Sequence, residues 1–208
     1  NGTPLTFVSE EILLIHTEIM TQTTVYEILS VTDGTGCVNP INQTITIVVN
    51  PLPTFTYELS ATELCYGEEL IWTEYFTGTP PWRVDFLFNG EPDFFISYNN
   101  PEIYTEIVTE SVTFEPLTVT DGNGCIGSVN QPVTITVNPL PTFTREISDT
   151  EICSGDEVTI TDYFTGAAPW TVTILKEGET FSFPVEESPA VRVMTLTETL
   201  TYEIVSVA

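Results

Sequence analysis

The sequence predicts an all-β protein made of tandem seven-stranded β-sandwich repeats with an 88-residue period. Three observations lead to this prediction. Several segments return at one fixed spacing along the chain. Short runs rich in β-branched and aromatic residues alternate with turn residues. No stretch shows the apolar spacing of an amphipathic helix.

The repeat is visible in segments far apart in the chain. Pro-Leu-Pro-Thr-Phe-Thr occurs at 51–56 and again at 139–144, which places its two copies 88 residues apart. Tyr-Phe-Thr-Gly at 75–78 returns at 163–166 with the same offset. A fixed period of this length is the signature of a chain built from one structural unit used repeatedly.

The period divides the chain into three parts. Residues 51–138 form a complete repeat, residues 1–50 the C-terminal part of a first repeat, and residues 139–208 the N-terminal part of a third. We therefore expect Asn1 to be an internal position of a longer chain. Each junction reads Val-Asn-Pro-Leu-Pro, and its two prolines favour a stiff, extended connection.

Within the complete repeat we expect one sandwich of seven strands. The predicted strands are 54–60, 68–75, 82–88, 93–98, 102–109, 112–120 and 132–138. In the third strand, Trp82, Val84 and Phe86 fall on one face and Arg83 on the other, which is the period of two of a strand. Asn-Gly at 89–90 then predicts a tight hairpin turn.

Aromatic residues indicate which kind of sandwich this is. Trp82 and Trp170 open the third predicted strand, where immunoglobulin-type sandwiches bury a tryptophan. Tyr26 and Tyr202 lie near the place of a tyrosine corner, where the middle repeat has Phe114. We interpret these aromatic side chains as core residues of an immunoglobulin-like fold.

Three motifs add a resemblance to a known family. They are Cys-x-Gly-Glu/Asp at 65–68 and 153–156, Gly-x-x-Pro-Trp at 78–82 and 166–170, and Thr-Asp-Gly-x-Gly-Cys at 32–37 and 120–125. Over its whole length the chain resembles the PKD-like and SprB-type repeats of giant Bacteroidetes cell-surface proteins. The resemblance implies type IX secretion, an extracellular location at the cell surface, and service as an adhesin or filament, sometimes in gliding motility. The chain departs from the family in having Trp where Tyr is usual after Gly-x-x-Pro, and in a long insert around 89–111.

The charge of the chain restricts its partners. It carries 30 acidic and 4 basic residues, a net charge of −26, yet is 41% hydrophobic and 11% aromatic, which is ample for a packed core. Nucleic acid is excluded because no cluster of Lys and Arg could bind phosphates. Membrane insertion is excluded because no apolar run approaches about 18 residues. We expect neighbouring repeats, and other copies in a fibre, as the partners.

Four cysteines, Cys37, Cys65, Cys125 and Cys153, are disulfide candidates in an exported protein. In an immunoglobulin-type strand order, Cys65 and Cys125 lie at opposite poles of one unit. A strand of about seven residues spans roughly 23 Å, whereas a disulfide needs Cα atoms within about 7 Å. This favours a bond from Cys65 to the next unit's equivalent of Cys125. One alternative is a bond within the unit, which requires displaced strands; the other is reduced thiols, which are less common in a secreted chain.

The Asp-Gly-x-Gly segments have two explanations. Asp and Gly are typical turn residues, so Asp33 and Asp121 could simply shape a turn. Alternatively, Asp33, Asp121 and Asn123 supply oxygen ligands to a weak calcium site, although the remaining ligands of an EF-hand are missing. Calcium is the one cofactor that the sequence suggests.

Function is predicted to be structural and not enzymatic. His16 is the single histidine, so no His-based triad or multi-His zinc site can form. The leading hypothesis is a repeat segment of a secreted adhesin or filament that provides reach. The alternatives are a module that binds surface polysaccharide, with Phe94, Phe95 and Tyr98 as its platform, and a spacer beside a secreted enzyme.

Overall fold

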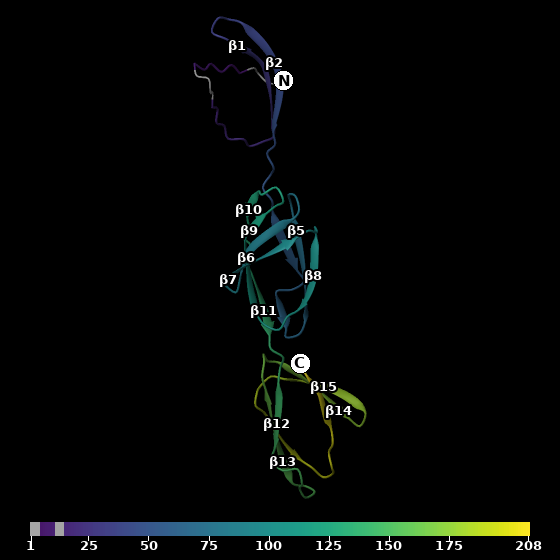
Figure 1. The fold of residues 1–208 in the computed structure, drawn as a ribbon. Helices are drawn as coiled ribbons and strands as arrows, with labels where there is room; N and C mark the ends of the chain where they lie inside the picture. The colour runs from purple at the N-terminus through teal and green to yellow at the C-terminus, as the bar shows by residue number, and fades with distance from the viewer. Residues whose placement is uncertain (1–4, 11–14) are drawn as a thin grey trace.

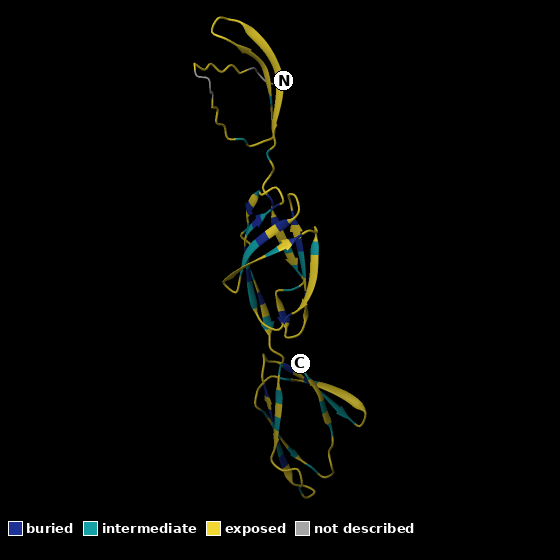
Figure 2. Ribbon diagram, viewed as in Figure 1, coloured by how far each residue is buried: buried dark blue, intermediate teal, exposed yellow. Residues whose placement is uncertain are grey.

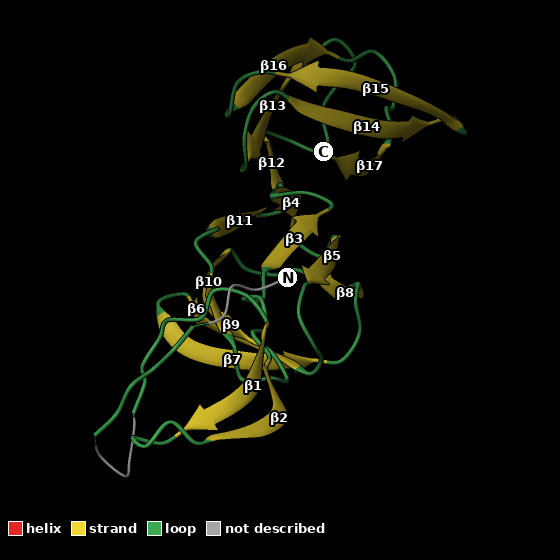
Figure 3. Cartoon of the chain, turned by 90° about the horizontal axis from the view of Figure 1, so that it is seen from above, coloured by secondary structure: helices red, strands yellow, loops and turns green. Residues whose placement is uncertain are grey.

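The computed structural model describes residues 5–10 and 15–208, and this part of the chain is all-β, without a helix (Figure 3). Its strands form three bodies that follow one another along the chain: a hairpin, a middle unit and a third unit (Figure 1). The all-β prediction is confirmed. Within these same residues no helix is long and apolar enough to cross a membrane.

The first body is a two-stranded antiparallel hairpin of β1 (Thr24–Thr32) and β2 (Val38–Ile47). Tyr26 lies opposite Ile45 in its register. Nearly all of its residues are exposed, as the yellow ribbon of Figure 2 shows. Among the described residues, no second sheet covers either face of the hairpin.

The middle unit is a sandwich of two sheets. One sheet has the order β3-β5-β8, and the other has the order β4-β11-β9-β6-β7 with the short β10 added to β9. The strands are β3 (Phe55–Leu59), β4 (Glu63–Cys65), β5 (Glu69–Phe76), β6 (Trp82–Phe88), β7 (Glu91–Ser97), β8 (Glu102–Ile107), β9 (Val112–Thr120), β10 (Ile126–Ser128) and β11 (Val133–Asn138).

The middle unit thus has nine strands, and the predicted count of seven is corrected. All seven expected strands are present within a few residues of their predicted ends. The two additional strands, β4 and β10, have 3 residues each, too few to display a period of two. β4 pairs in parallel with the end of β11, where Cys65 lies opposite Asn138.

Two apolar clusters fill the space between the sheets of the middle unit, which is where the buried residues of Figure 2 concentrate. The larger contains Trp82, which is 5% exposed and stacks on Phe76. The Trp82 indole Nε1 donates a 2.9 Å hydrogen bond to the Thr77 carbonyl, so its polar atom is satisfied inside the core. The smaller cluster is built on Leu70 and Ile135.

The strands of the third unit are arranged like the corresponding strands of the middle unit. The strands are β12 (Phe143–Ile147), β13 (Glu157–Phe164), β14 (Trp170–Lys176), β15 (Glu179–Val185), β16 (Ala190–Thr195) and β17 (Glu203–Val207). They form the sheets β12-β13-β16 and β15-β14-β17. Trp170 stacks on Phe164 and donates to the Thr165 carbonyl, as Trp82 does with its own neighbours.

The chain enters and leaves the middle unit at opposite ends (Figure 1). At entry, Pro53 is buried beneath β10, and a Cβ atom on Gly127 would lie 2.0 Å from the Pro53 carbonyl oxygen. Only glycine permits this close approach of two backbones. At exit, the chain continues from β11 beside β4 into the second Pro-Leu-Pro segment.

Candidate functional site

The Asp-Gly-x-Gly segments form tight turns that the aspartates organise. Asp121 Oδ1 accepts hydrogen bonds from the backbone N–H groups of Asn123 and Cys125, both at 3.0 Å. Its Oδ2 accepts one from the Thr79 N–H at 3.2 Å. Burial raises the pKa of Asp121, but hydrogen bonds from the Thr79, Cys125 and Asn123 N–H groups outweigh it, and the pKa is lowered.

The first turn repeats this arrangement. Asp33 Oδ1 accepts from the hydroxyl and N–H of Thr35 and from the N–H of Cys37. The Thr35 hydroxyl is the largest cause of the lowered pKa of Asp33, and the Cys37 N–H adds to it. Both aspartates therefore act as acceptors for the turn backbone. Among the described residues, no group of three His, Cys, Asp or Glu side chains could hold a metal ion.

A glycine of the second turn has a steric role as well. A Cβ atom on Gly122 would lie 2.4 Å from the carbonyl oxygen of Pro80, which belongs to the loop before β6. The Gly122 N–H donates to the Thr79 carbonyl at 2.6 Å. The turn is thus packed directly on this loop, which accounts for the glycine without any ligand.

The four cysteines carry free thiols in the described part of the chain, and Cys65 and Cys125 lie at opposite poles of the middle unit. Cys65 is the last residue of β4, which pairs with the part of β11 that extends past the first residue of β9. Cys125 lies in the turn that follows the last residue of β9. β9 has 9 residues and separates the two cysteines by its length, about 30 Å. That separation is far beyond the reach of a disulfide. Cys37 and Cys153 occupy a turn and a loop of the other bodies.

Of the three aromatic residues of the predicted polysaccharide platform, Phe95 and Tyr98 line one pocket, whereas Phe94 lies apart from them. Phe94 and Phe95 are successive residues of β7, so their side chains leave opposite faces of the sheet. Phe95 packs against Phe55 and Phe86 in the core, whereas Phe94 carries the Arg83 guanidinium at 3.9 Å from its ring centroid. Tyr98, just after the strand, is 69% exposed.

A feature that the sequence analysis missed lies on the central strand of the β3-β5-β8 sheet. Glu74 is 1% exposed, and its Oε2 has no hydrogen-bond partner among the described residues. Burial raises the pKa of Glu74 to about 7; the Glu102 charge adds to the rise, and the approach of Tyr104 and Trp72 opposes it. The missed signal was a glutamate in a strand whose other inward positions are apolar.

The third unit also buries a carboxylate, but there the chain supplies cations. Asp162 is 1% exposed. Its Oδ1 accepts a 2.6 Å hydrogen bond from Arg145 Nε, and its Oδ2 accepts a 2.8 Å hydrogen bond from Arg145 Nη2. Arg192 Nη2 donates to the same Oδ2. Burial alone would raise the pKa of Asp162, but the hydrogen bonds and charges of the two arginines lower it.

No family model matches the sequence, and no curated protein matches it. Among solved structures, the chain is similar to part of a 1.5-MDa bacterial ice-binding adhesin, at 17% identity and a TM-score of 0.36. That match covers 77% of this chain and spans 59% of the adhesin chain.

Two further structures show similar levels of likeness. The fibronectin(III)-like modules of CbhA from Clostridium thermocellum match at 12% identity and a TM-score of 0.32, over 69% of this chain and 80% of that one. The ligand-binding domain of human OSCAR matches at 14% identity and a TM-score of 0.30, over 76% and 98%. TM-scores this low do not indicate a function for this chain.

Proposed function

We propose that the chain is a repetitive structural segment of an extracellular adhesin or filament, related to the PKD-like and SprB-type repeats that its motifs resemble. In this proposal the repeat unit is 51–138, with a period of 88 residues and partial units on either side. Its task is to provide reach from a cell surface, and no catalysis is involved.

The observation that carries the proposal is the course of the chain through the middle unit. The chain enters beneath β10 at one pole and leaves beside β4 at the other, and each pole carries a Pro-Leu-Pro segment (Figure 1). Both apolar clusters of this unit draw only on residues between Phe55 and Val137. A unit that closes its own core and passes the chain straight through extends an array when it is multiplied.

The electrostatics support the same function. At a net charge of −26, neighbouring copies repel one another in solution, which disfavours collapse of the array onto itself. His16, the single histidine, is exposed and lies 3.7 Å from the Glu18 carboxylate.

Tandem copies of the repeat test the proposal. One, two and four copies of 51–138 joined by their own linkers should give maximum dimensions, measured by small-angle X-ray scattering, that increase by an equal increment per copy. A maximum dimension that stops rising between two and four copies would show that the units fold back on one another, and would overturn the proposal.

A further inference from the structure

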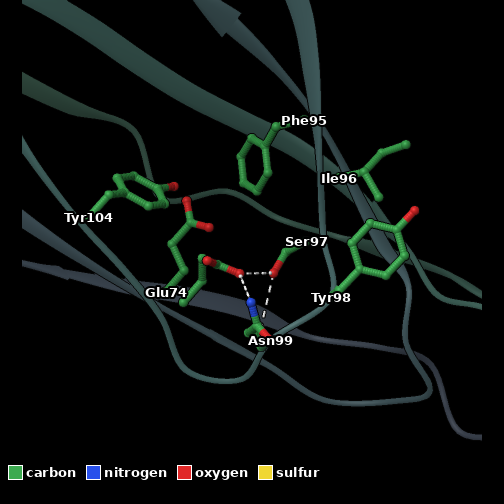
Figure 4. A pocket seen from close by; sticks show the side chains of 8 residues that line it. Glu74, Phe95, Ile96, Ser97, Tyr98, Asn99 and Tyr104 are labelled. Atoms are coloured by element: carbon green, nitrogen blue, oxygen red, sulfur yellow. Dashed lines mark hydrogen bonds between the residues drawn. The ribbon is translucent and has the colours of Figure 1, made fainter.

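A pocket opens beside the buried carboxylate of Glu74. It has a volume of about 460 Å³, and its lining includes Glu74, Glu102, Phe95, Tyr98 and Tyr104. Figure 4 shows the Tyr104 hydroxyl next to the Glu74 carboxylate, with Phe95 on the same side. Two carboxylates and three aromatic rings around one space are the groups that bind an organic cation.

Among the described residues, the Tyr104 hydroxyl and the Trp72 indole approach the Glu74 carboxylate, but no cation does. Its Oε2 is enclosed and unpartnered within the part of the chain that the structure describes. An ionised carboxylate buried without a compensating charge or hydrogen bonds is strongly destabilising. The titratable groups around the Glu74 carboxylate are Tyr57 of β3 and Glu102 and Tyr104 of β8, and none of them is a cation. On the side of β7, the residues near this carboxylate are Phe95 and Ser97.

The third unit shows what fills the corresponding space. Arg192 donates to Asp162, and its guanidinium carbon lies 5.4 Å from the centre of the Phe183 ring. The Arg192 guanidinium thus donates a hydrogen bond to a buried carboxylate and also lies over an aromatic ring. Arginine suits such a position because its planar group donates to carboxylates and also stacks on rings.

The two places correspond by strand register. Glu74 lies opposite Tyr57, and Asp162 lies opposite Arg145. Tyr104 is two residues beyond the partner of Glu74 on β8, as Arg192 is two residues beyond the partner of Asp162 on β16.

The aromatic ring is equivalent as well. Phe95 lies opposite Val84, and Phe183 lies opposite Val172. The middle unit therefore keeps the carboxylate and the ring of this arrangement, and has tyrosines where the third unit has both of its arginines.

We propose that the pocket beside Glu74 binds a guanidinium group from outside the chain, held between the Glu74 carboxylate and the Phe95 ring. The group is either that of a free guanidinium compound or that of an arginine side chain on another protein. Either one supplies the charge and donors that Arg192 supplies within the third unit.

The test is a titration of the ¹⁵N-labelled 208-residue chain by NMR, with the indole N–H of Trp72 as the reporter. Trp72 Nε1 is buried and unpartnered among the described residues, and Trp72 lies close enough to Glu74 to lower its pKa. N-acetyl-arginine methylamide should give a saturable shift of this signal. N-acetyl-citrulline methylamide, which has nearly the same shape without the charge, should give none.

Variants locate the site. Glu74→Gln should weaken binding of the arginine derivative at least about 10-fold, the loss expected when one charge-assisted hydrogen bond is removed. Glu69→Gln makes the same change at an exposed position of the same strand, and should leave binding unchanged. Tyr104→Arg should also abolish binding, because the new side chain would occupy the pocket as Arg192 does in the third unit.

Proton competition gives a second readout. Since the pKa of Glu74 is about 7 and its bound form must be ionised, affinity should fall roughly 10- to 100-fold from about pH 8 to about pH 5. The pH dependence should disappear in Glu74→Gln.

Methylguanidinium distinguishes the two sources of the guanidinium group. If it binds more weakly than the arginine derivative, the natural ligand is an arginine side chain; if it binds equally well, the ligand is a free guanidinium compound.

Three results would overturn the proposal. They are the absence of a saturable shift with the arginine derivative, equal binding of the citrulline derivative, and unchanged binding in Glu74→Gln with the fold intact. Equal affinity for N-acetyl-lysine methylamide would overturn the assignment of a guanidinium in particular.

Discussion

The indole ring of Trp82 stacks on the ring of Phe76, with centroids 5.0 Å apart and planes inclined by 15°. The pair joins the first residue of β6 to the last residue of β5, and so connects the two sheets of the middle unit. It lies within the larger apolar cluster of that unit. Sheet-to-sheet contact at this point therefore depends on one large side chain.

Trp82→Ala should destabilise the isolated fragment 51–138 by about 3–5 kcal/mol, because it removes a core-filling ring and leaves a cavity. The fragment is expected to fold alone, since both of its clusters are internal. Glu106→Ala, at an exposed position of β8, should cost less than about 0.5 kcal/mol. Urea denaturation measures both, and comparable losses at the two positions would contradict the assignment of Trp82 to the core.

The pH dependence of the same fragment should show the buried Glu74. Its pKa is raised from 4.5 to about 7, so the folded unit holds a proton more tightly than the unfolded chain does. The stability that Glu74 contributes is present in full below about pH 4.5 and is lost as the pH rises through about 7. The free energy of unfolding should therefore fall from about pH 5 to about pH 8, and fall less in Glu74→Gln. Parallel curves for the two proteins would contradict this account.

The carboxylate of Asp121 should matter through its hydrogen bonds. Asp121→Asn leaves only one acceptor oxygen where the turn uses two, so the melting temperature of the fragment should drop. Because the turn N–H groups already occupy the carboxylate, CaCl₂ and NaCl should raise the melting temperature equally at matched ionic strength. A larger effect of CaCl₂ that Asp121→Asn removes would establish the calcium site.

The cysteines should not pair within a unit, because β9 holds Cys65 and Cys125 at opposite ends. A single copy of 51–138 should keep both thiols reactive towards Ellman's reagent after oxidative refolding. In a tandem of two copies, Cys65 of the first and Cys125 of the second should form one bond across the joint, which leaves two of the four thiols reactive.

Mass spectrometry of a non-reduced digest identifies the linked peptides in both proteins. A Cys65–Cys125 pair from the single copy as the dominant species would end the proposal of a bond between neighbours. Four reactive thiols in the tandem would show that the joint is held by its proline segment alone.

The sequence alone was sufficient to predict the features that depend only on residues close together in the chain. Alternation along 82–88 predicted β6, and Asn-Gly at 89–90 predicted the turn that follows it, because side-chain direction and turn geometry are local properties. Trp82 and Trp170 are core residues, as predicted, since an indole at an inward strand position is buried by whichever sheet covers it. β4 and β10 were not predicted, because a strand of 3 residues is too short to show a period of two.

Only the tertiary structure decided which polar residues are buried and what they meet. The period of two along β5 places Glu74 on the inward face and Glu69 on the outward one, but it does not show what Glu74 meets there, since its neighbours Tyr57 and Tyr104 come from other strands. Burial of a charge is a property of the space between two sheets, and it is set by side chains tens of residues apart.

The same reason applies to the aromatic platform. The pair Phe94-Phe95 reads as one aromatic patch in sequence, but the pleat of β7 sends Phe95 into the core and leaves Phe94 outside beneath Arg83. The sequence by itself determined the strands, the turns and the large core rings. The assembly of two sheets decided that Glu74 is enclosed with no cation of its own, because that depends on which strands face one another across the core.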